Sequence, residues 1–161
     1  MFEMSLLFLI GRVVPESILF AWAIYTLSHT KMHLKRYFLS VIIMVVLAYG
    51  INLLPIHYGV HTLLTMVGLI ITNIVINKIS TIKSIVVTFS TIIIEFICEI
   101  IDLFTLQYFF NIDTEYIASN AQLKILYGLP SLLLFLLTII LVKFILNKIE
   151  IKKITKNILD L

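Results

Sequence analysis

The sequence predicts an all-α integral membrane protein, a polytopic bundle of about five transmembrane helices. Of its 161 residues, 61% are hydrophobic and only 13% are charged, which is far from the composition of soluble globular domains. Segments such as "YFLSVIIMVVLAYGINLL" and "PSLLLFLLTIILVKFIL" are apolar all round, whereas a surface helix of a soluble protein keeps one polar face. We therefore expect a multi-pass protein of the cell membrane, surrounded by the lipid bilayer.

Five spans are predicted, because about 20 mostly apolar residues cross the hydrocarbon layer as a helix. In chain order they cover residues 4–28, 37–54, 60–77, 84–110 and 125–146. One alternative stays open for the first span: Gly11 and Pro15 interrupt it, so residues 1–13 could instead lie flat on the outer surface. The predicted division is a transmembrane bundle over 1–147 and a short basic amphipathic tail over 148–161.

The basic residues predict the orientation of the bundle. Of 12 Lys and Arg residues, ten fall in the "SHTKMHLKR" loop, the "NKISTIK" loop and the tail from Lys143 onward, which leaves Arg12 and Lys124 for the other side. Loops rich in Lys and Arg remain in the cytoplasm. The N-terminus is therefore expected outside and the C-terminus in the cytoplasm, as five crossings require. The same distribution makes the positive charge a feature of topology, and no nucleic-acid partner is expected.

Three acids interrupt the apolar segment "TIIIEFICEIIDLF" in the fourth predicted span. Glu95, Glu99 and Asp102 are spaced i, i+4 and i+7, so they lie along one face of a helix. A carboxylate that faces lipid costs several kcal/mol. This acidic stripe is therefore expected to face the bundle interior.

Other polar side chains are predicted at a similar depth, and together they form the candidate ligand-binding site. Arg12 is expected to pair with Glu16, four residues later, and with Glu99 or Asp102, inside an outward-opening polar pocket. Two interpretations stay open: a pocket for a ligand or ion, favoured because four acids exceed what one Arg neutralises, and a purely structural clamp. His57 and His61 could hold a metal by spacing alone, but Gly59 marks a turn between them and no metal is assigned. The candidate ligand-binding residues are Arg12, Glu16, Asn52, His57, His61, Glu95, Glu99 and Asp102.

Two further features concern contacts between helices. Asn73 and Asn77 end the third predicted span, where helix-to-helix hydrogen bonding or capping is expected. In the tail, apolar residues follow a 3, 4, 3 spacing that suits a short coiled coil with a partner helix. The alternative is an amphipathic helix that lies on the anionic inner leaflet, anchored by its lysines. The apolar tail residues are Ile151, Ile154, Ile158 and Leu161.

Three phrases, "VVPESILFAWAIYTL", "INLLPIHYGVHTLL" and "LYGLPSLLLF", together resemble the membrane-spanning sensor regions of accessory-gene-regulator-type sensor histidine kinases of Gram-positive bacteria. The resemblance implies a receptor module in the bacterial cytoplasmic membrane that senses a signal, in some members a peptide of quorum sensing, and passes it to a kinase. After the last span this chain has only "NKIEIKKITKNILDL", without a phosphoacceptor histidine or an ATP-binding domain. Within that family it is expected to be a stand-alone sensor module or a relic of one.

The functional prediction is a non-enzymatic sensor or accessory module that binds a small signal and couples it to a cytoplasmic partner. That partner is expected to be a histidine kinase or another signalling protein, and a homodimer is a further option. The alternative is the membrane subunit of a transporter, or a proton- or cation-coupled carrier that uses the acidic stripe. No enzyme and no cofactor are expected, because no nucleophile, metal triad or phosphate loop accompanies the acids.

Overall fold

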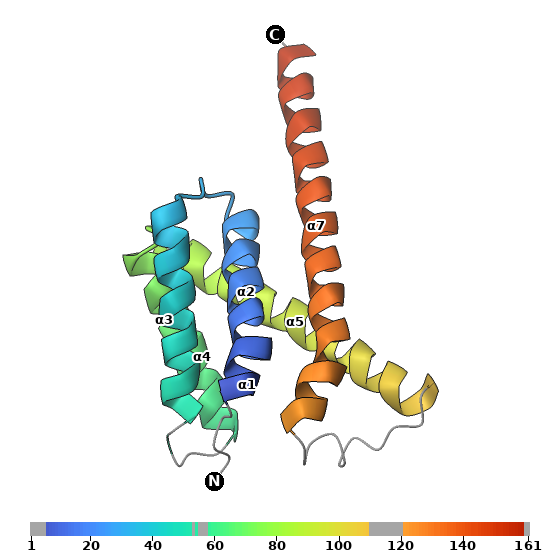
Figure 1. Ribbon diagram of the computed structural model, residues 1–161. Helices are drawn as coiled ribbons and strands as arrows, with labels where there is room; N and C mark the ends of the chain where they lie inside the picture. The colour runs from blue at the N-terminus through green and yellow to red at the C-terminus, as the bar shows by residue number, and fades with distance from the viewer. Residues whose placement is uncertain (1–5, 53, 55–57, 110–120, 160–161) are drawn as a thin grey trace.

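The computed structural model describes residues 6–52, 54, 58–109 and 121–159, and within these ranges the side chains except at 6, 52, 58, 59, 121, 122, 124 and 150–159 (Figure 1). All regular structure in the described residues is helical. The elements are α1 (Leu6–Phe8), η1 (Leu9–Val13), α2 (Val14–Leu27), α3 (Leu34–Asn52), α4 (Tyr58–Val75), α5 (Thr81–Phe109) and α7 (Ala121–Leu159). The prediction of an all-α bundle is confirmed.

The helices match the predicted spans, although one of them is short. The segments Leu9–Leu27, Leu34–Ile51, Thr81–Phe109 and Ile125–Ile149 are long and apolar enough to cross a membrane. In α4 the apolar segment is the shorter Val60–Val75, and the whole helix rises only about 27 Å at 1.5 Å per residue. Four helices of spanning length are thus established in the described residues, and the fifth crossing stays a prediction.

The first three elements form one continuous helix. Phe8, Val13 and Val14 all have right-handed helical backbone angles, so α1, η1 and α2 run on without a break. Pro15 has no N–H to donate to Gly11, and the backbone widens here into a π turn in which the N–H of Val14 bonds the Leu9 carbonyl. This continuity favours a first span that begins before Gly11 over a separate surface helix for residues 6–13.

Helix α2 lies at the centre of the bundle and contacts α3, α5 and α7. Ala21, Ala23 and Ile24 are fully buried. The two alanines are small, so the neighbouring helices can approach α2 closely. Phe20 packs against Phe135 of α7 in the same core. By contrast, Phe38 and the apolar residues that follow it along one face of α3 are exposed, as expected for a surface that lipid covers.

The helices alternate in direction, which gathers basic segments at one end of the bundle. In Figure 1 the α2–α3 turn lies at the same end as the far part of α7, which projects beyond the other helices, while α5 crosses the bundle obliquely. The segment after α4 also lies at this end, because the Asn77 side chain is hydrogen-bonded to Tyr25, near the end of α2, and to Ser40, near the start of α3. We call this the basic end; it carries Lys31, Lys35, Arg36, Lys78, Lys83, Lys143 and Lys148.

Candidate functional site

Arg12 lies in the π turn, near the end of the bundle opposite the basic end. Its Nη2 donates a hydrogen bond of 2.5 Å to Glu99 Oε1 of α5, and its Nε lies 3.7 Å from Glu16 Oε2. The Arg12 side chain is 19% exposed, whereas that of Glu99 is 42% exposed. The predicted pairing of Arg12 with Glu16 and with one acid of the stripe is confirmed, and Glu99 is the partner in α5.

Asp102, the other possible partner, faces α7 instead. It is 6% exposed, and its carboxylate lies next to the backbone N–H of Ser131. This contact occurs one residue after Pro130, which lies inside helix α7 and lacks an N–H of its own. Asp102 of α5 therefore contacts the backbone of α7. Arg12 is also near enough to interact with the Asp102 carboxylate electrostatically.

Gly128 of α7 makes the position of Arg12 possible, and sequence reasoning missed it. A Cβ atom added at Gly128 would collide with Nη1 of the Arg12 guanidinium. The guanidinium thus lies directly against the α7 backbone, between α5 and α7. The only sequence signal is a glycine within the "LYGLP" motif, which does not identify the side chain that it accommodates.

Replacing Gly128 with alanine is expected to displace the Arg12 guanidinium and weaken its bond to Glu99. We expect the free energy of unfolding in detergent to fall by about 1–2 kcal/mol, since a hydrogen bond between charged groups contributes roughly 1.5–3 kcal/mol and alanine returns part of this through helix propensity. Gly50→Ala in α3 is the matched control, because a Cβ there meets nothing within 4 Å. Equal effects of the two substitutions on thermal unfolding would contradict the close approach.

A cavity of about 250 Å³ lies beside the Arg12 cluster, between α2, α3, α4 and α5. Glu16 and Glu95 both line it, and their carboxyl groups lie close enough to interact directly. His61, in the first turns of α4, is the third titratable group in its wall. The remaining lining residues are mostly apolar or carry hydroxyls: Val13, Ser17, Phe20, Met44, Ala48, Thr62, Thr65, Leu69 and Ile92. We call this space the acidic cavity.

The predicted site residues are therefore divided between two neighbouring places. Glu16, Glu95 and His61 line the acidic cavity, whereas Arg12 and Glu99 form the ion pair beside it. Asp102 is buried against α7, and His57 and the side chain of Asn52 lie outside the described part of the structure. In the described residues, no three His, Cys, Asp or Glu side chains are grouped so that they could hold a metal ion.

A buried network of polar side chains connects four helices toward the basic end. Asn77 Oδ1 accepts a hydrogen bond of 2.7 Å from the Tyr25 hydroxyl and lies 2.6 Å from the Ser40 hydroxyl. Asn77 Nδ2 donates to Asn73 Oδ1 (3.0 Å), and Asn73 Nδ2 donates to Thr88 Oγ1 (3.1 Å). The predicted helix-to-helix role of Asn73 and Asn77 is confirmed. We call these five residues the asparagine network.

Comparisons with models of protein families, with curated proteins and with solved structures find no match to this chain. The resemblance to sensor regions of histidine kinases therefore remains a prediction. What the geometry offers chemically is a small cavity lined by two carboxyl groups, beside an Arg12 guanidinium that Glu99 and Glu16 share. Such a site suits a ligand that carries a positive charge or donates hydrogen bonds.

Proposed function

We propose that this chain is a non-enzymatic sensor or accessory module of the bacterial cytoplasmic membrane, which binds a small amine in the acidic cavity. The amine is a free small molecule or one amino group of a peptide signal. The observation that supports this proposal is that the Glu16 and Glu95 carboxyl groups lie close together in the wall of one cavity, which is on the Arg12 side of the bundle and away from the basic end.

The charge balance around the cavity favours a cationic ligand. Arg12 supplies the one guanidinium of this site, and both Glu99 and Glu16 lie within ion-pair distance of it. Three carboxyl groups, those of Glu16, Glu95 and Glu99, therefore share one fixed positive charge, so the cavity can still accept a cation or hydrogen-bond donors. Apolar walls that include Phe20, Met44 and Leu69 would cover the hydrocarbon part of the ligand.

The size of the cavity limits what can enter it. Its volume of about 250 Å³ lies below the roughly 300–1,000 Å³ typical of sites for drug-sized ligands. A peptide would therefore insert only a single side chain or its terminal amino group, and the rest of it would remain outside the cavity.

The orientation proposed for the bundle places the cavity on the outer side. Loops rich in Lys and Arg remain in the cytoplasm, so the basic end would be cytoplasmic and the acidic cavity would face the exterior. Helix α7 then offers a route for the signal. It touches the Arg12 guanidinium at Gly128 and continues as one helix to Leu159, so a shift of α7 at the site would move its far end.

Charge-selective labelling tests the ligand class and the orientation together. A Thr65→Cys variant, made in a Cys98→Ser background, places a thiol in the cavity wall. Intact cells are treated with membrane-impermeant thiol reagents, one cationic and one anionic. We expect the cationic reagent to react about tenfold faster, which corresponds to about 1.4 kcal/mol of electrostatic preference. Adding Glu16→Gln and Glu95→Gln is expected to abolish that preference.

Thr105→Cys supplies the matched control, because Thr105 is exposed on α5 and its hydroxyl bonds only the Ile101 carbonyl of its own helix. It is expected to show little preference between the reagents. A Thr65→Cys thiol that reacts equally with both reagents would refute the cation site. Labelling that occurs only after the cells are opened would reverse the proposed orientation.

The coupling step has its own test. Deleting residues 148–161 is expected to leave membrane insertion and the labelling of Thr65→Cys unchanged, because the cavity lies at the other end of the bundle. The deletion should abolish crosslinking and co-purification of a cytoplasmic partner from the native host, since it removes the last part of α7. A truncated protein that still captures the same partner would exclude the tail as the output element.

The closeness of the Glu16 and Glu95 carboxyl groups in one cavity favours one second candidate, a proton- or cation-coupled carrier. Two neighbouring carboxyl groups can share a proton, and an entering cation could displace it. Proteoliposomes loaded with a pH-sensitive dye distinguish the two candidates. Proton movement that depends on an added amine and on Glu95 supports the carrier, whereas a sensor binds the amine without net flux.

A further inference from the structure

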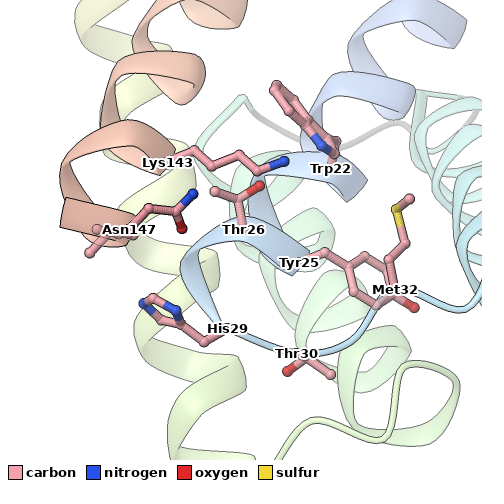
Figure 2. Close-up of a pocket in the computed structure, with 9 residues that line it drawn as sticks. Trp22, Tyr25, Thr26, His29, Thr30, Met32, Lys143 and Asn147 are labelled. Atoms are coloured by element: carbon pink, nitrogen blue, oxygen red, sulfur yellow. The ribbon is translucent and has the colours of Figure 1, made fainter. Parts of the chain in front are cut away.

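A second cavity, of about 210 Å³, lies at the basic end between the last turns of α2, the α2–α3 turn and α7 (Figure 2). It is separate from the acidic cavity and shares none of its residues. We call it the basic-end groove. The polar and aromatic side chains that line it are Trp22, Tyr25, Thr26, His29, Thr30, Lys143 and Asn147.

The donors in this groove suit an anion. Lys143 extends from α7 toward α2, and its Nζ lies 5.4 Å from the centre of the Trp22 ring (Figure 2). His29, whose φ of 50° lies in the left-handed region, and Asn147 add an imidazole and an amide on the same side (Figure 2). None of the nine lining residues is acidic. The groove therefore offers hydrogen-bond donors and positive charge with no carboxylate to satisfy them.

The position of the groove matches the depth at which lipid headgroups lie. Trp22 lies near the end of a spanning helix, and tryptophans are enriched where membrane meets water. Lys143 lies near the end of the apolar run of α7, where a lysine can reach the interface. Basic pockets between transmembrane helices are sites at which the headgroups of anionic lipids bind.

The backbone around the groove is compatible with an anion. The end of a helix carries partial negative charge on its free carbonyls. In α2, however, the Ile24 and Thr26 carbonyls already accept hydrogen bonds from the N–H groups of Ser28 and His29. The last turn of α2 is thus closed on itself, and the side-chain donors determine the chemistry of the groove.

We propose that the basic-end groove binds a phosphate group, with Lys143 as its principal cation and Trp22 as its aromatic wall. The volume of about 210 Å³ is too small for a nucleotide-sized ligand and suits a single phosphate. An anionic lipid headgroup and free phosphate from solution share this chemistry. This site is independent of the acidic cavity and of its proposed ligand.

The test uses the full chain in detergent and in nanodiscs, with phosphatidylglycerol, phosphatidylcholine and inorganic phosphate as probes. Trp22 is the only tryptophan of the chain, so its fluorescence reports on the groove directly. Native mass spectrometry counts the lipids that remain bound. Lys143→Met is expected to weaken phosphatidylglycerol binding about tenfold, the effect of losing one charge-assisted hydrogen bond.

Lys148→Met is a closely matched control. Lys148 is also on α7 and also lies over an aromatic ring, that of Phe144 at 4.7 Å, but it does not line the groove. The control removes the same charge and is expected to change lipid binding by no more than about twofold. Thermal unfolding of both variants establishes that each remains folded.

The outcomes separate the sources of the phosphate. Binding of phosphatidylglycerol over phosphatidylcholine that depends on Lys143 assigns the groove to a lipid headgroup. A change of Trp22 fluorescence on adding millimolar inorganic phosphate without lipid, again dependent on Lys143, assigns it to phosphate from solution. If the two lysine variants weaken binding equally, or if no probe responds to Lys143, the proposed site is overturned.

Discussion

Replacing Arg12 with methionine is expected to lower the free energy of unfolding in detergent by about 2–4 kcal/mol. Removing one partner of a buried ion pair costs roughly 3–5 kcal/mol, and the lower figure applies here because Glu99 is 42% exposed. The substitution leaves Glu16, Glu99 and Asp102 close together without the guanidinium that lies among them. Thermal unfolding of the purified protein measures the loss.

The double variant Arg12→Met/Glu99→Gln tests whether Glu99 is the main partner of Arg12 or whether the stability comes from several carboxylates around the guanidinium. Removing both charges is expected to restore more than half of the stability that Arg12→Met loses, since Glu99, which makes the shorter of the two contacts to Arg12, is then no longer a carboxylate without a partner. Arg36→Met is the control, because Arg36 is exposed at the basic end and its loss should be nearly neutral. A double variant as unstable as Arg12→Met would show that Glu99 is not the main partner.

The same double variant also tests whether the Arg12–Glu99 ion pair serves only to hold the helices together or is needed for cation binding in the acidic cavity. If the ion pair acts only as a clamp, the double variant should recover stability and keep the preference of the acidic cavity for the cationic reagent. That outcome is expected here because Glu16 and Glu95, the acids of the cavity wall, are retained in the double variant.

Replacing Asn77 with leucine is expected to lower the free energy of unfolding by about 2 kcal/mol. The substitution removes the acceptor of the Tyr25 hydroxyl and the donor to Asn73, and it also leaves Ser40 without its side-chain partner. Hydrogen bonds between membrane helices average about 0.6 kcal/mol and reach about 1.7 kcal/mol, so three contacts together give this magnitude. Chemical denaturation in mixed micelles is the measurement.

Asn147→Leu is the matched control, with the same change of side chain at an exposed position of α7. It is expected to alter stability by less than about 0.5 kcal/mol. Thr88→Val adds a graded comparison, because it removes only the contact at the far end of the asparagine network. If Asn77→Leu were no more damaging than Asn147→Leu, the asparagine network would not contribute to holding the helices together.

The positions of the helices could be predicted from the sequence because hydrophobic length is a local property. The predicted spans 37–54 and 60–77 correspond to helices Leu34–Asn52 and Tyr58–Val75, with boundaries that differ by two or three residues. Helix ends are less certain from sequence because they depend on caps and turns. The start of the first span was open for this reason: Gly11 and Pro15 suggest a break, yet the backbone accommodates them with a π turn.

Part of the candidate site could also be predicted, because a charged side chain within an apolar span must pair with an opposite charge or face the bundle interior. Arg12 lies four residues from Glu16, and a guanidinium within a span requires a carboxylate, so their pairing follows from the sequence. The partners of Asn77 could not be predicted. Tyr25 lies in α2, Ser40 in α3 and Asn77 just after the end of α4, and their meeting depends on how these helices are rotated against one another.

The sequence by itself determined the all-helical class, the apolar segments and the face of α5 that carries the acids, because each follows from composition and from a 3.6-residue period. The tertiary structure alone decided which acid lines the cavity and which acid pairs with Arg12. Glu95 and Glu99 are one turn apart on α5, yet the oblique crossing of this helix brings Glu95 to the acidic cavity and Glu99 to Arg12 (Figure 1). It also decided that Gly128 admits the guanidinium, because the approach of a side chain from one helix to the backbone of another depends on helix packing and leaves no periodic signal in the sequence.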